Sequence, residues 1–75
     1  MTATEVLDAL ATRFPSRTIV ISETCYYHGS SVGRYIEHVI SIQPGLDGLD
    51  NQNFGGNSLQ EALVKFNLAA MNYGK

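Results

Sequence analysis

The feature that most constrains the fold is a pair of strand-forming runs joined by a short glycine-bounded turn. Residues 17–28 and residues 34–42 are both rich in β-branched and aromatic side chains, which favour extended backbone. The residues between them, 29–33, have the sequence Gly-Ser-Ser-Val-Gly, which is typical of a turn. This pattern predicts a β-hairpin.

The apolar residues of the two runs also predict the register of the hairpin. In the best register, four isoleucines face one another in two pairs: Ile19 with Ile42, and Ile21 with Ile40. A slip of one residue would place these isoleucines opposite polar side chains. The same register gives four further pairs: Glu23 with His38, Thr24 with Glu37, Cys25 with Ile36, and Tyr26 with Tyr35. We therefore expect one largely apolar face and an opposite face that carries the tyrosine pair.

A helix is predicted before the hairpin, over residues 3–14. Thr2 and Glu5 form a capping-box pattern at its start, and Pro15 ends it because the residue before a proline is pushed out of the helical region. The apolar residues form one stripe at helical spacing: Ala3, Val6, Leu7, Leu10 and Phe14. This helix should therefore bury a single side.

The second half of the chain is predicted to be a loop followed by a helix. Residues 43–57 are rich in glycine and amide side chains, and within them residues 52–54 are compatible with a short third strand in which Phe54 anchors the loop to the core. Ser58 and Glu61 form a second capping-box pattern, which begins a helix over residues 59–73.

The predicted fold is therefore α+β, of order α-β-β-(β)-α. An antiparallel hairpin or three-stranded sheet would carry two helices on one face, because this arrangement buries all the apolar surfaces together. Residues 1–75 are expected to form a single domain. A chain of this size buries only roughly 60% of its unfolded surface, so its stability is marginal unless its core is efficient or it associates.

The last helix is apolar on two opposite sides. One side carries seven apolar residues at helical spacing: Leu59, Ala62, Leu63, Phe66, Ala69, Ala70 and Tyr73. The opposite side carries Val64, Leu68 and Met71, which we call the outer stripe. A second stripe needs a second cover. The cover is either another molecule, which means a second copy or a protein partner, or a part of the same chain, which means the glycine-rich loop or the first helix. A third alternative is that the three residues of the outer stripe are simply tolerated in water.

An open edge of the sheet is a second route to association. Proline and lysine, which commonly protect edge strands, are absent from both strand runs. The alternative is that the edges are twisted away or covered by loops. The residues expected to bind a partner are two tyrosines of the hairpin and the outer stripe: Tyr26, Tyr35, Val64, Leu68 and Met71.

No catalytic residue, metal ligand or cofactor site is predicted, so the chain is expected not to be an enzyme. Glu23 opposite His38 is compatible with an acid–base pair, but a peripheral ion pair is favoured because no nucleophile is evident beside it. Cys25 is expected to be a small core residue. Residues 47–53 lack the fixed ligand offsets of an EF-hand and should be a plain turn.

Composition restricts the partners. The net charge is −2, and the five basic residues are scattered, so nucleic acid is not an expected partner: Arg13, Arg17, Arg34, Lys65 and Lys75. The single cysteine excludes an intrachain disulfide and fits a reducing compartment. No run has the length of a membrane span or the pattern of a signal peptide, so we expect a cytoplasmic protein, in the host cytoplasm if it is viral.

Two families share features with the second half of the chain. The order α-β-β-β-α, with a glycine-rich approach to the last helix, resembles a double-stranded-RNA-binding domain, although residues 57–61 carry none of the lysines with which that family meets phosphate. Residues 42–45 (Ile-Gln-Pro-Gly) and 56–63 (Gly-Asn-Ser-Leu-Gln-Glu-Ala-Leu) resemble HicB-type antitoxins. These resemblances imply, as alternatives, a nucleic-acid-binding module or an antitoxin.

In size and in its hairpin–helix plan, the whole chain resembles the small orphan proteins encoded by tailed bacteriophages. That resemblance implies a protein that acts by binding another protein, as an inhibitor of a host factor or defence system (such as an anti-CRISPR protein) or as a minor assembly factor. The leading expectation is thus a small non-enzymatic binding protein of viral or mobile-element type, whose last helix forms a dimer or docking surface.

Overall fold

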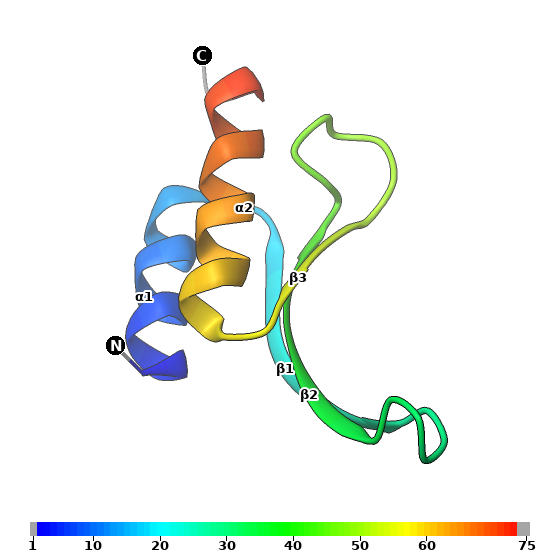
Figure 1. Ribbon diagram of the computed structural model, residues 1–75. Helices are drawn as coiled ribbons and strands as arrows, with labels where there is room; N and C mark the ends of the chain where they lie inside the picture. Colours follow the sequence, from blue (N-terminus) through cyan, green and yellow to red (C-terminus); the bar gives the residue numbers. More distant parts are fainter. Residues whose placement is uncertain (1, 74–75) are drawn as a thin grey trace.

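A computed structural model of the chain describes residues 2–73. Its elements follow one another in the order α1 (Ala3–Arg13), β1 (Thr18–Tyr27), β2 (Arg34–Gln43), β3 (Gln52–Gly56) and α2 (Leu59–Tyr73). The strands form one antiparallel sheet in the order β1-β2-β3, and both helices lie on the same side of it (Figure 1). The predicted α+β fold is confirmed, and the third strand extends two residues beyond the predicted 52–54.

The hairpin register is the predicted one. β1 pairs with β2 so that Ile19 faces Ile42 and Tyr26 faces Tyr35, and the other predicted pairs follow. Both ends of the turn between the strands are glycines with positive φ, Gly29 at 82° and Gly33 at 81°. Other residues rarely adopt that backbone conformation, which explains why glycine bounds this turn.

The core lies between the two helices and the sheet, and Phe66 of α2 is at its centre. Its ring is fully buried and meets the rings of Phe14 and Phe54 edge to face, with centroid separations of 5.8 Å and 5.1 Å. The other buried apolar residues surround it: Val6, Leu10, Ile40, Ile42, Leu46, Ala62 and Ala70. Phe54 thus anchors its segment to the core as expected, whereas the burial of Leu46 in the preceding loop was not anticipated.

The helices cover only part of the hairpin. α1 packs on β1, and α2 packs on β2 and β3. β3 ends at Gly56, opposite His38, so the hairpin beyond that pair has only two strands. We call this projecting part, residues 24–37, the arm; Figure 1 shows it curving away from the helices. The radius of gyration, 13.4 Å, exceeds the roughly 11 Å of a compact domain of this length.

The arm explains one wrong prediction. Cys25 was expected in the core, but it is exposed, and its partner across the hairpin, Ile36, is 44% exposed. Both side chains lie on the sheet face that carries the helices, as the alternation of a strand requires. They are uncovered because this face continues past the ends of the helices.

The two helix starts differ in their caps. At α1 the full capping box is present: the Glu5 N–H donates to the Thr2 hydroxyl at 3.2 Å, and the Thr2 N–H donates to the Glu5 carboxylate at 2.8 Å. At α2 the Glu61 N–H donates to the Ser58 hydroxyl at 3.1 Å, but the Glu61 carboxylate lies 3.8 Å from the Lys65 ammonium. Its position beside Lys65 places it in an ion pair along the helix.

Removal of the Phe66 ring should destabilise the fold severely. Phe66→Ala is expected to lower the free energy of unfolding by about 3–5 kcal/mol, as is usual for a buried aromatic ring. Urea unfolding followed by circular dichroism would measure the change. Val32→Ala is the control, because Val32 is 65% exposed at the hairpin turn and its truncation should change stability by less than about 0.5 kcal/mol. If Val32→Ala lowered the free energy of unfolding as much as Phe66→Ala does, the central position of Phe66 in the core would be contradicted.

The capping box of α1 should make stability depend on pH. The Thr2 N–H and hydroxyl hold the pKa of Glu5 below its ordinary value. A lowered folded-state pKa contributes stability at neutral pH that is lost as the pH falls through that pKa. Glu5→Ala should therefore lower the melting temperature at neutral pH, and the difference from wild type should shrink in acid. Asp8→Ala, another carboxylate deletion on α1, should not reproduce this pattern.

Candidate functional site

The outer stripe of α2 faces away from the core. Val64, Leu68 and Met71 are 50%, 60% and 71% exposed. The opposite side of α2 supplies Ala62, Phe66 and Ala70 to the core, with Leu59, Leu63 and Ala69 partly buried around it. The side chain of Tyr73, expected on that inner side, lies outside what the structure describes. None of the described loop or α1 residues buries the outer stripe, so it is presented to solvent.

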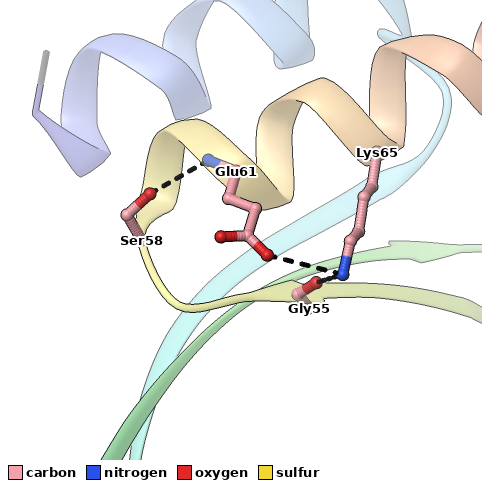
Figure 2. A network of polar contacts seen from close by, with 4 residues as sticks. All are labelled: Gly55, Ser58, Glu61 and Lys65. Atoms are coloured by element: carbon pink, nitrogen blue, oxygen red, sulfur yellow. Dashed lines mark hydrogen bonds and ion pairs between the residues drawn. The ribbon is translucent and has the colours of Figure 1, made fainter.

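Polar contacts on both flanks hold α2 against the rest of the fold. On one flank, Arg13 of α1 donates from Nη1 to the Asn67 side-chain oxygen at 2.9 Å. On the other flank, the Lys65 ammonium donates to the Gly55 carbonyl of β3 at 2.9 Å and lies beside the Glu61 carboxylate (Figure 2). These contacts orient the outer stripe relative to the sheet.

The two predicted tyrosines form part of an aromatic cluster on the arm. Tyr26, Tyr35 and His28, which we call the aromatic cluster, stand nearly parallel on the sheet face opposite the helices. Their ring centroids are 4.9–5.6 Å apart and their planes are within 14–19° of one another. The His28 Nε2 atom lies 3.1 Å from the Tyr35 hydroxyl oxygen, within hydrogen-bonding distance. The hairpin register brings Tyr26 and Tyr35 together, while His28 joins them because it lies two residues beyond Tyr26 on the same face.

Glu37 fixes the position of one ring of the cluster. The Tyr26 hydroxyl donates to the Glu37 carboxylate at 3.2 Å. This hydrogen bond and the negative charge of Glu37 raise the pKa of Tyr26 above its ordinary value, because ionisation would remove the donated proton and place two negative charges together. The cluster is thus an ordered surface.

The helix-facing side of the arm is a shallow apolar groove. Cys25, Tyr27 and Ile36 line it, together with Arg34 and with Asn57 at the approach to α2. Tyr27 is 65% exposed. The sequence did not predict this groove, since Cys25, opposite Ile36, was expected in the covered core.

Glu23 and His38 lie where the register predicts. The His38 Nδ1 atom is 3.8 Å from the Glu23 carboxylate, and the Glu23 side chain is more than half exposed. A shallow depression beside the pair is lined by Ala3, Leu59 and Ile21. The two side chains form an ion pair only when His38 is protonated, and the exposure of the Glu23 side chain makes such a pair weak.

The loop between β2 and β3 contains the expected plain turn. The Asp47 carboxylate accepts the Leu49 N–H at 2.9 Å, and Gly48 has a φ of 78°. Leu46 is buried, and its N–H donates to the Gln52 side-chain oxygen at 2.7 Å. Leu46 lies inside a turn that the Gly48 N–H closes on the Gly45 carbonyl at 2.9 Å, and its burial follows from the way this loop folds onto the core.

Within residues 2–73, no three His, Cys, Asp or Glu side chains come close enough together to hold a metal ion. Neither helix in that range is long and apolar enough to cross a membrane.

Comparisons with protein-family models, with curated proteins and with solved structures find no match for this chain.

Loss of the Glu37 carboxylate should alter the ionisation of Tyr26. Glu37→Gln removes the negative charge that raises the pKa of Tyr26, so this tyrosine should ionise at lower pH. Ultraviolet titration of tyrosinate would detect the shift, and Tyr26→Phe would identify which step belongs to Tyr26. Glu23→Gln removes a carboxylate from the other face of the sheet and should leave the titration unchanged. An unchanged curve for Glu37→Gln would contradict the hydrogen bond.

Proposed function

We propose that this chain is a small non-enzymatic binding protein that acts through contact with another protein, and that the outer stripe of α2 is its contact surface. The observation that carries the proposal is the exposure of Val64, Leu68 and Met71 in one line on a helix fixed at both flanks. Single exposed apolar side chains are ordinary, but aligned ones on an ordered helix are typical of helix-mediated contacts.

The aromatic cluster supports a protein partner rather than a small-molecule one. Tyrosine is enriched in protein interfaces because it buries a large area and loses little conformational freedom on binding. Tyr26 and Tyr35 already stand in fixed positions on the arm before any partner arrives. They would therefore add contact area at a small entropic cost.

The biological role that we propose follows from the resemblance to small bacteriophage proteins. A protein of this size with two exposed contact surfaces suits an inhibitor that occupies a functional surface of a host or defence protein, or a minor assembly factor. Nucleic-acid binding gains little support from the start of α2, since Glu61 is there and the nearest cation, Lys65, bonds to Gly55 and neighbours that carboxylate.

Leu68→Lys tests this function. A charge in the middle of the outer stripe should abolish the association that the stripe makes, while circular dichroism stays unchanged because Leu68 is 60% exposed. Affinity capture would detect the partner and its loss. The matched control is Leu49→Lys in the β2–β3 loop, where the side chain is 78% exposed.

Two results would contradict the proposal. If Leu68→Lys unfolds the protein while Leu49→Lys does not, Leu68 is a core residue. If Leu68→Lys captures partners as the wild type and Leu49→Lys do, the outer stripe is not the contact surface.

A further inference from the structure

The sheet has one long open edge. β1 is an outer strand because the strand order is β1-β2-β3, and it runs for ten residues without proline or lysine. The sequence did not determine whether either edge of the hairpin is unprotected. In the structure β3 pairs with β2, so the outer edge of β1 has no neighbouring strand. An unprotected edge strand of this length is a template for pairing with another strand.

The hydrogen bonds of the hairpin show which backbone groups face this edge. The His28 N–H donates to the Gly33 carbonyl at 3.1 Å, so this pair is a hydrogen-bonded one. Such pairs alternate along an antiparallel ladder, so the even-numbered residues of β1 bond to β2. The odd-numbered residues, 19 to 27, turn their N–H and C=O groups outward. None of the hydrogen bonds recorded among residues 2–73 uses these outward groups.

The position of α1 limits how a second strand can approach. The first residue of α1, Ala3, lies beside Ile21, Ser22 and Glu23 in the shallow depression near that end of the helix. α1 therefore accompanies the first half of β1, and the arm half is free of helices. In an antiparallel pair of two copies, most of each α1 would lie next to the bare arm of the other copy, and the two helices would approach each other only at their first residues.

We propose that the chain forms a symmetric dimer in which β1 pairs antiparallel with β1 of a second copy, with Ser22 facing Ser22 across the two-fold axis. A second copy is the occupant that the edge favours, because two identical open edges satisfy each other in a closed arrangement. The proposal goes beyond the function proposed above and uses a different surface.

The register follows from overlap and charge. Only the odd-numbered residues of β1 turn backbone groups outward. The two-fold axis must therefore pair odd-numbered residues of one copy with odd-numbered residues of the other. An axis at Ser22 pairs residues 18–26 of both copies. An axis at Glu23 gives a similar overlap but sets two carboxylates directly opposite each other, which is destabilising. The Ser22 axis instead places Val20 opposite Thr24.

This dimer would have one continuous sheet with all four helices on one face. α2 packs on β2 and β3, on the far side of each copy from the new contact. Both outer stripes would therefore remain free, and the dimer would offer two copies of the contact surface. Two linked sites bind a multimeric or repetitive target more tightly than one site does.

Cysteine cross-linking tests the register. In the proposed ladder between the two β1 strands, Ser22 and its counterpart form a non-hydrogen-bonded pair. The Cα atoms of such a pair are about 4.5 Å apart, within reach of a disulfide. In a Cys25→Ser background, Ser22→Cys should give a covalent dimer under mild oxidation on a non-reducing gel. The control is Thr24→Cys in the same background, because Thr24 is also exposed on the same face but would face Val20 of the second copy. Equal yields from both variants, or no cross-linking of Ser22→Cys, would overturn the proposal.

Backbone substitution provides an independent test. Glu23→Pro removes an outward N–H and no bond to β2, and proline is tolerated at such edge positions. Light scattering of the wild type should give twice the chain mass of 8.2 kDa, and Glu23→Pro should give the monomer mass with unchanged circular dichroism. Leu68→Lys should keep the dimer, which separates this contact from the outer stripe. A wild type that stays monomeric at high concentration, or a dimer that Leu68→Lys dissociates, would overturn the pairing of β1.

Discussion

The surfaces of this protein depend on a mismatch between the lengths of its strands and its helices. β1 and β2 each have ten residues and extend about 33 Å, whereas the eleven residues of α1 extend about 17 Å. Both helices lie on one face of the sheet and end before the hairpin does. The apolar side chains of that face therefore continue beyond the helices. The arm and the exposure of Cys25, Tyr27 and Ile36 result from this mismatch. A two-stranded ribbon alone is only marginally stable in water, so partial cover also makes a partner for the arm advantageous.

The covered half of the sheet is held together by aromatic contacts and close backbone approach. Phe66 joins the end of α1, through Phe14, to β3, through Phe54. β3 can turn directly into α2 because of Gly56, where a Cβ atom would come within 2.8 Å of the Ala62 nitrogen. At Gly55 a Cβ atom would meet the Glu37 carboxylate at 2.7 Å, but this is the end of a flexible side chain that could move aside. The same glutamate bonds Tyr26, so the packing of β3 and the order of the aromatic cluster are connected.

The described surface divides into parts with different chemistry. The outer stripe is apolar and lies on a helix, the aromatic cluster has polar atoms at the edges of its rings, and the open edge of β1 offers backbone groups. A partner that covers one of them leaves the others available. This separation is why a dimer through β1 and a protein contact through α2 are compatible, and why substitutions at Ser22, Glu23 and Leu68 can distinguish them.

Much of the fold and part of the candidate site could be predicted from the sequence because they arise from short-range periodicity. The two-residue alternation of the isoleucines determined the hairpin register, and Thr2 with Glu5 determined the start of α1. The period of α2 separated its inner side from Val64, Leu68 and Met71. Tyr26 and Tyr35 were paired correctly, since register alone brings them together.

Other features were decided only by the tertiary structure. Strand alternation is the same along the whole hairpin, so it could not show where the helices end, and Cys25 was wrongly assigned to the core. The burial of Leu46 depends on the geometry of the loop between β2 and β3. That β1 is the open edge depends on the side from which β3 returns. Local patterns determine which side of an element is apolar, but only the packing of all the elements determines which of those sides remain uncovered.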